Sequence, residues 1–248
     1  MANVASTQLV NASSQFWSIT NAAQTGLNFT TAFTLAAWIN VNALSATYPF
    51  IAKVDGGASA LQYNFYTNGD KKLTLDISDN GGQGAGHFGR FVTTATQINS
   101  TATWIHIAVT FSTSAGTPTV IFYVNGSSVA SSETIGTTVG SLFSGTQAFE
   151  VGYDNGYSGT HFDGLMDDVR VYNAVLTSGQ ISSLFSTPCT FSDPGSLQGK
   201  WLFENNGNDS SANANNLTNN NSATFSSNVP YVCGGGVVSN AAFLLKMI

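Results

Sequence analysis

The sequence predicts an all-β protein, a two-sheet antiparallel jelly-roll sandwich with one short helix near residues 177–185. Three observations predict this fold. Short segments in which apolar and polar residues alternate recur at regular spacing along the chain. Turn residues such as Asn-Gly separate these segments, and no long stretch has the apolar periodicity of a helix. Many short strands without long helices are typical of double-sheet sandwiches.

The first part of the chain contains six predicted strands. We expect them at residues 8–10, 16–19, 33–41, 50–53, 61–66 and 73–77. In the third of these, period-two alternation places Trp38 on one face and five apolar side chains on the other, namely Phe33, Leu35, Ala37, Ile39 and Val41. The last two strands flank Asn68-Gly69 and form a predicted hairpin. The glycine-rich residues 79–86 indicate an exposed loop.

The middle of the chain continues the same pattern. Residues 104–111 and 120–124 are predicted strands. Asn125-Gly126 follows directly and is typical of a type I′ hairpin turn, in which both central residues have positive φ. Residues 149–152 form a further short apolar segment before the last long strand.

The last long strand and the helix lie within residues 161–185. After an Asp163-Gly164 turn, residues 165–172 are apolar at Leu165, Val169 and Val171, which predicts a strand with one buried face. Thr177 or Ser178 then provides a cap for the short helix. Three apolar residues share one face of that helix, namely Ile181, Leu184 and Phe185.

Several of these strings resemble the signatures of laminin G-like domains in the concanavalin A-like lectin and glucanase superfamily. They are FTLAAWI at 33–39, WIHIAVTF at 104–111 and HFDGLMDDVRVYNAVLTSGQISSLF at 161–185. The resemblance runs from about residue 8 to residue 185 and implies a jelly roll of the concanavalin A-like type over residues 1–187. It says little about function, because one fold carries many different sites.

The C-terminal residues 188–248 resemble the opening strands of the same domain type. Residues 197–204 and 208–218 match the usual beginning of the family, and residues 240–243 match its next element. The order of the elements is therefore circularly permuted. The segment either completes its own sandwich, which a high effective concentration favours, or inserts into a neighbouring copy and gives a dimer or filament. A truncated second repeat is the third alternative.

The composition restricts the class of partner. Hydrophobic residues make up 42% of the 248 residues and charged residues only 8%, so the surface depends on Asn, Ser, Thr, Gln and Gly for its polarity. The net charge of −6, with only seven Lys and Arg, argues against a nucleic-acid partner. No apolar run has the length of a membrane span, and no signal peptide is visible.

Such a neutral surface suits an extracellular, cell-surface or virion protein. Cys189 and Cys233 are the only cysteines. A disulfide between them would suit an oxidising compartment, and two unpaired thiols are the alternative.

The sequence does not predict an enzyme. Glycoside hydrolysis needs two carboxyl groups that flank one bond, but Glu133, Glu150 and Glu204 are far apart in the sequence. Asp167 and Asp168 are adjacent and would point to opposite faces of a regular strand. A glycosidase therefore remains an alternative only if the fold brings distant carboxyl groups together.

The family resemblance implies carbohydrate binding and a structural calcium ion. Sugars bind to exposed aromatic rings that are flanked by amides and carboxylates, and one loop carries this combination: Tyr153, Asp154, Asn155, Tyr157 and His161. Calcium prefers several oxygen ligands, and the family commonly holds it near the corresponding loop and strand, which suggests Asp209, Asn213 or Asn215, and Asp167 or Asp168 as ligands here. Ala212 replaces the usual glycine of that loop, and the alternative is that Asp209 only caps a turn.

These observations predict a non-catalytic binding or adhesion module. Its expected ligand is a glycan or another cell-surface ligand. The alternative is a structural subunit of an extracellular filament or virion, which would self-associate by strand exchange through residues 188–248.

Overall fold

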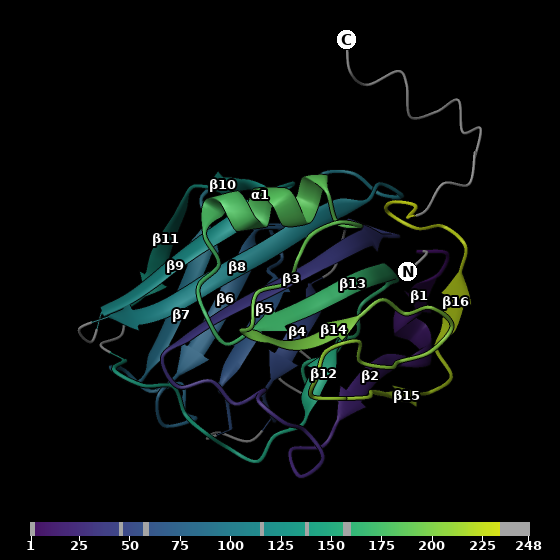
Figure 1. Ribbon diagram of the computed structural model, residues 1–248. Helices are drawn as coiled ribbons and strands as arrows, with labels where there is room; N and C mark the ends of the chain where they lie inside the picture. Colours follow the sequence, from purple (N-terminus) through teal and green to yellow (C-terminus); the bar gives the residue numbers. More distant parts are fainter. Residues whose placement is uncertain are drawn as a thin grey trace.

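The computed structural model describes residues 3–44, 47–56, 60–114, 117–136, 139–155 and 160–233. Within these residues, two antiparallel sheets of eight strands each pack face to face, and we call them sheet A and sheet B (Figure 1). The predicted all-β sandwich with one short helix is therefore confirmed. No helix in the described part of the chain is long and apolar enough to cross a bilayer.

The strand order shows how distant segments come together. Sheet A runs through β10 (Ser127–Val129), β9 (Thr117–Val124), β8 (Ile105–Ser114), β3 (Ala32–Val41), β13 (Gly164–Tyr172), β1 (Ser6–Leu9) and β16 (Thr224–Ser226), and β14 (Leu197–Trp201) also pairs with β13. Sheet B runs through β11 (Ser131–Ile135), β7 (Phe88–Thr93), β6 (Leu73–Ser78), β5 (Tyr63–Thr67), β4 (Tyr48–Lys53), β12 (Phe149–Val151), β2 (Phe16–Ile19) and β15 (Thr218–Asn220). A short 3-10 turn, η1 (Asn11–Ser13), connects β1 to β2.

The main core fills the space between the two sheets. In β3 the five residues predicted to share a face all belong to this core, namely Phe33, Leu35, Ala37, Ile39 and Val41. Burial of one large apolar side chain stabilises a fold by about 1.5–3 kcal/mol, so this alternation fixes which face of β3 points inward. Trp38 lies on the other face, as predicted, and its ring stacks 5.5 Å from that of Phe185.

The α-helix of the described residues, α1 (Ser178–Ser186), lies on the outer face of sheet A (Figure 1). Thr177 caps it, because its side chain accepts a hydrogen bond from the Gln180 N–H and the Gln180 side chain accepts one from the Thr177 N–H. Ile181 and Leu184 are buried in a second apolar cluster with side chains of sheet A. The predicted cap and two residues of the predicted apolar face are thus confirmed.

Two turns have the backbone geometry that their residues allow. Asn125 and Gly126 have φ values of 47° and 78°, which confirms the type I′ turn. Gly164 opens β13 with a φ of 149°, and a Cβ atom there would lie 2.2 Å from the Asn40 carbonyl oxygen. Only glycine allows β13 to approach β3 so closely at this point.

β13 departs from the predicted alternation. Met166, Val169 and Val171 belong to the core, whereas Leu165, predicted to point inward, is only half-buried. The reason is a bulge: the register against β3 shifts between Asp167 and Arg170. An extra residue in one strand moves the side chains that follow to the opposite face. The prediction for Leu165 was therefore wrong, and so was the assumption of a regular strand at the two aspartates.

The C-terminal segment adds three strands to sheets of the same chain. β14 pairs with the second half of β13, β15 with β2, and β16 with β1. A disulfide joins Cys189 to Cys233, whose Cα atoms are 5.4 Å apart. Of the two alternatives for the cysteines, the structure has the disulfide. Residues 240–243, which resemble the family's next element, lie outside the described residues.

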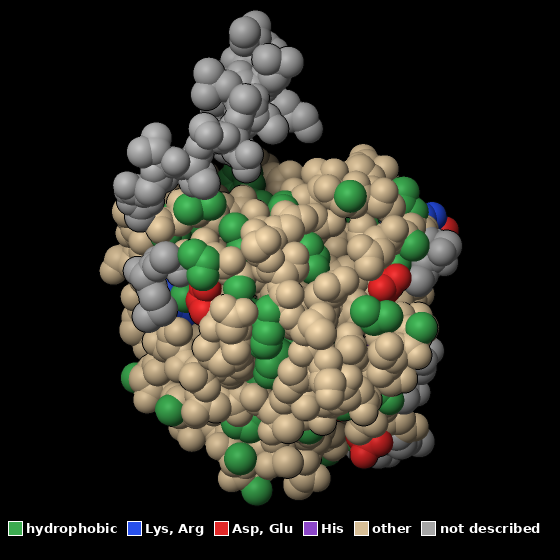
Figure 2. Space-filling model, turned by 90° about the vertical axis from the view of Figure 1, so that its right-hand side faces the viewer, with side chains coloured by type: hydrophobic (Ala, Val, Ile, Leu, Met, Phe, Trp, Pro, Cys, Tyr) green, Lys and Arg blue, Asp and Glu red, His purple; other side chains and the backbone are tan. Residues whose placement is uncertain are grey.

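The surface is as neutral as the composition indicates. Figure 2 shows one face of the molecule, on which acidic and basic side chains are few.

Candidate functional site

Four polar side chains form a row across the outer face of sheet B. Glu150 in β12, Asn64 in β5, Asp76 in β6 and Arg90 in β7 are aligned by the strand register, with Ala52 of β4 between the first two. Their sequence neighbours Phe149, Tyr63, Leu75 and Phe91 belong to the core on the other face. Because side chains alternate along a strand, all four members of this polar row point outward.

One end of the polar row is closed by an ion pair. Arg90 donates hydrogen bonds from Nε and Nη2 to the two carboxylate oxygens of Asp76, both at 2.7 Å. The Tyr66 hydroxyl donates a third hydrogen bond to Asp76, at 3.1 Å. Two-pronged pairing of this kind holds both side chains in a fixed geometry.

The other end of the polar row combines acidic groups with unsatisfied oxygens. Asn64 Nδ2 donates a hydrogen bond to Asp154 Oδ2 at 3.2 Å. Glu150 Oε2 and Asn64 Oδ1 are buried and have no hydrogen-bond donor among the described residues. Burial raises the pKa of Glu150 from its ordinary value of 4.5 to about 8, and the negative charges of Asp154 and Asp55 contribute to the rise. Glu150 is therefore largely protonated at neutral pH.

An aromatic stack adjoins this end of the polar row. Tyr153 and His161 face each other as an isolated bridge, and their rings are parallel, 4.1 Å apart with an interplanar angle of 7°. The ring of Phe16 lies 4.8 Å from Tyr153 and 5.7 Å from His161. The backbone N–H of His161 donates a hydrogen bond to Asn11 Oδ1.

Both rings of the stacked pair are partly exposed. Burial lowers the pKa of His161, which keeps its imidazole neutral at neutral pH. Because Tyr153 covers one face of the imidazole, His161 offers a ligand only its other face.

The structure brings together four of the five residues predicted to bind sugar. Tyr153, Asp154, Asn155 and His161 lie at the end of β12, and Tyr157 lies outside the described residues. Asp154 is fully buried, so it lies beneath the exposed residues of the site and does not form part of its surface. Asn155 is partly exposed, and its carbonyl oxygen accepts a hydrogen bond from the Gly56 N–H at 2.7 Å.

The residues predicted to bind calcium near the C-terminus have other partners. Asp209 accepts four hydrogen bonds within its own segment, from the N–H groups of Lys200, Ser211 and Asn215 and from the Ser211 hydroxyl. Asn215 Oδ1 accepts one from the Thr25 N–H. Asn213 donates to the carbonyl and side-chain oxygens of Gln198. Asp209 thus holds the loop closed as a turn cap does.

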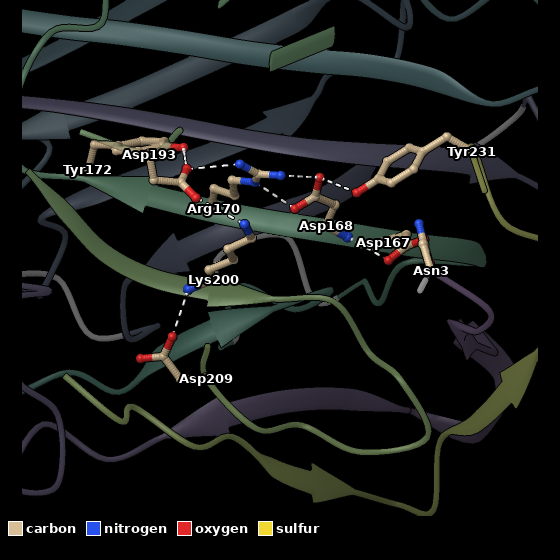
Figure 3. A network of polar contacts seen from close by, with 9 residues as sticks. All are labelled: Asn3, Asp167, Asp168, Arg170, Tyr172, Asp193, Lys200, Asp209 and Tyr231. Atoms are coloured by element: carbon tan, nitrogen blue, oxygen red, sulfur yellow. Dashed lines mark hydrogen bonds and ion pairs between the residues drawn. The ribbon is translucent and has the colours of Figure 1, made fainter. Parts of the chain in front are cut away.

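The two aspartates of β13 also have partners, shown in Figure 3. Asp167 accepts hydrogen bonds from Asn3 Nδ2 and the Asp168 N–H. Asp168 accepts from Arg170 and from the Tyr231 hydroxyl. The described residues contain no group of three or more His, Cys, Asp and Glu that could hold a metal ion. The residues predicted to bind calcium thus all have hydrogen-bond partners within the protein, and calcium binding by them stays a prediction.

The carboxyl groups of Glu150 and Asp154 come close enough to influence each other. Their side chains belong to residues only 4% and 0% exposed, so neither carboxyl can reach a glycosidic bond from the described surface. Among the described residues, this part of the site therefore lacks the open pair of carboxyl groups that glycoside hydrolysis uses.

Sequence reasoning missed Glu150 and Asn64 as members of the site. Each lies between two apolar residues of a predicted strand, so alternation alone could have placed both on the outer face. Their proximity depends on how β12, β4 and β5 pair, which no local pattern contains.

Two solved structures share this architecture. A candidate carbohydrate-binding protein from Bacteroides ovatus ATCC 8483 matches with a TM-score of 0.64 and 17% identity, over 94% of this chain and 62% of that one. This chain thus spans less than two thirds of that protein. A heptameric SAP-like pentraxin from Limulus polyphemus matches with a TM-score of 0.57 and 15% identity, over 90% of this chain and 94% of that one. At these identities the likeness shows the fold.

The sequence itself places the chain in a family. No curated protein sequence is significantly similar to it. The sequence profile of the concanavalin A-like lectin/glucanases superfamily matches residues 12–182, which is more than half of the chain, and the chain therefore belongs to this superfamily.

Proposed function

We propose that this protein is a non-catalytic carbohydrate-binding module whose ligand docks at the end of β12. The observation that carries the proposal is the stack of His161 on Tyr153, two partly exposed rings beside the polar row. A sugar ring has an apolar face that packs on an aromatic surface and a hydroxyl rim that needs hydrogen-bond partners. Asn155 supplies an amide next to the stack.

The similar structures support the same class of ligand, since one of them is a candidate carbohydrate-binding protein. The disulfide suits a protein that acts outside the cell or on its surface, because disulfides persist in oxidising compartments. The structural-subunit alternative gains no support, because β14, β15 and β16 pair with strands of their own chain.

The charges near the site favour a neutral sugar. Arg90 is paired with Asp76, and Lys53 Nζ donates to Asn21 Oδ1 and the Gln147 carbonyl oxygen. Arg90 and Lys53 therefore have partners already, whereas the negative charge of Asp154 would repel a carboxylate of an acidic sugar.

Calcium belongs to the same proposal, at a different place from the sequence prediction. A divalent cation would displace the proton that Glu150 holds at neutral pH, would balance the negative charge of Asp154, and would give Glu150 Oε2 and Asn64 Oδ1 the partner that the described residues do not supply. We therefore expect Ca²⁺ at Glu150 and Asp154, with no role for Asp209.

A glycan array followed by titration calorimetry tests the sugar site. His161→Ala and Tyr153→Ala should each weaken binding by more than about tenfold, because an aromatic hot spot contributes about 1.4 kcal/mol or more. Phe191→Ala is the matched control, since this aromatic ring is also half-buried but lies beside α1 on sheet A. Equal affinity in all three variants would exclude this site, and silence on the array would exclude the function.

A further inference from the structure

The last described residues of the chain cross the outer face of sheet A as a strap, which we define as residues 229–233. Before the strap, Asn228 is well fixed: the Trp104 indole N–H donates to its side chain at 2.9 Å and the Ser6 hydroxyl to its carbonyl oxygen at 2.8 Å. Beyond Asn228, the described polar contacts are fewer. They are the Tyr231 hydroxyl on Asp168, a weak Cys189 Sγ contact to the Val232 carbonyl oxygen, and the Cys189–Cys233 disulfide.

The surface under the strap is poorly matched to it. The Tyr231 ring lies 6.1 Å from that of Trp38, which is only 7% exposed, and His106, which is 1% exposed, packs against Trp38 and Phe185. Trp38 Nε1 and His106 Nδ1 have no hydrogen-bond partner among the described residues. A cavity of about 70 Å³ also lies between Tyr231, Arg170, Asn3 and the two cysteines. Buried polar atoms without partners and unfilled space both weaken a contact.

The chain between the two cysteines is fixed without the disulfide. Trp201 and Phe203 belong to the main core, as do Leu217 and Ala223. β14, β15 and β16 are paired within the two sheets. Loss of the disulfide should therefore affect the strap and leave the sandwich in place, because local opening begins where buried contacts are few.

We propose that the Cys189–Cys233 disulfide is a redox latch, and that its reduction releases the strap and exposes the Trp38 ring while the sandwich stays folded. Cys189 is exposed and Cys233 is partly exposed, so a thiolate can reach the bond. A dithiol reductant supplies two electrons: the S–S bond breaks, each cysteine sulfur takes up a proton as a thiol, and the reductant is oxidised to its own disulfide. The latch lies on sheet A and is independent of the proposed sugar site on sheet B.

Acrylamide quenching of tryptophan fluorescence tests the latch on the full chain. Dithiothreitol should raise the Stern–Volmer quenching constant, because Trp38 becomes accessible. Trp38→Phe is the control variant and should abolish the rise, which separates Trp38 from Trp104, the partner of Asn228. A Cys189→Ser, Cys233→Ser double variant should show the raised constant without reductant.

Two results would overturn the proposal. An unchanged quenching constant in both the reduced protein and the double variant would mean that the strap stays closed without its disulfide. Loss of a cooperative thermal transition in circular dichroism would mean that the disulfide holds the whole fold together. A raised constant with a cooperative transition is the result that we expect.

Discussion

Asp168 and Arg170 lie two residues apart in β13 and form a doubly hydrogen-bonded ion pair, with Arg170 Nε and Nη2 at 2.6 and 2.8 Å from the Asp168 oxygens. Asp168 has a φ of 44°, the left-handed value of a bulge residue. The bulge thus turns Val169 and Val171 into the core and leaves two opposite charges together on the outer face (Figure 3).

This ion pair is the centre of a network that attaches the C-terminal segment. Arg170 Nη1 also donates to Asp193, which in turn accepts from Lys200 and from the Tyr172 hydroxyl. The side chains of Arg170 and Asp168 are each only 1% exposed. A buried charge without its partner is costly, so the network should respond strongly to the loss of one member.

Arg170→Met tests this expectation. Removal of the guanidinium leaves Asp168 buried without its ion partner, and we expect the free energy of unfolding to fall by about 3–5 kcal/mol. Urea unfolding followed by circular dichroism measures the change. When Asp168→Asn is added to Arg170→Met, part of the stability should return, because the buried Asp168 charge is removed while Asp193 keeps its ion pair with Lys200. If the single variant costs no more than an exposed substitution, the network does not stabilise the fold.

Glu150→Gln should change the pH dependence of stability. The pKa of Glu150 is raised by burial, from 4.5 to about 8, so between these values the unfolded chain has already lost the proton that the folded chain retains. Stability attributable to this group therefore falls as pH rises from about 4.5 to about 8. The glutamine side chain does not titrate, so the slope in this window should decrease. An identical slope in both proteins would contradict the buried environment of Glu150.

Lys53→Met should also change the pH dependence of stability, but with the opposite sign and in a higher pH range. Burial lowers the pKa of Lys53 from 10.5 to about 7. Between these values the unfolded chain binds the proton that the folded chain lacks, so stability rises as pH increases from about 7 to about 10.5. Methionine removes this rise, which thermal melts at several pH values detect. Lys72→Met, at a partly exposed position, is the control and should leave the rise unchanged.

The sequence predicted the architecture well because each strand contains its own evidence. The alternation in residues 33–41 depends only on which side chains must be buried, and the structure follows it at every position of β3. β13 shows where this reasoning ends. The bulge lets the strand start close to β3 at Gly164, place the ion pair on the outer face and still direct its apolar side chains into the core. Only the pairing of β13 with β3 and β14 determines where the bulge lies.

The candidate site was predictable to the extent that it is local. Tyr153 and His161 lie in one loop region, and their residue types already indicated sugar binding. Glu150, Asn64, Asp76 and Arg90 come from four strands, so only the register of sheet B places them in one row. Sequence spacing could not distinguish the carboxylate that closes its own loop, Asp209, from one whose Oε2 lacks a donor among the described residues, Glu150.

The effect of Ca²⁺ on the Tm tests whether the ion binds at Glu150 or at Asp209. Ca²⁺ that binds only the folded chain raises its stability, by about 2.7 kcal/mol when the free ion is at roughly 100 times its Kd. The Tm of the unchanged protein should therefore rise with added Ca²⁺, and the rise should be lost in Glu150→Gln. Asp209→Asn should lower the starting Tm, because Asp209 accepts four hydrogen bonds, yet it should retain the calcium-dependent rise. The reverse pattern, with the rise lost only in Asp209→Asn, would return the ion to the C-terminal loop. No rise in any of the three proteins would remove calcium from the proposal and leave sugar binding to the aromatic stack alone.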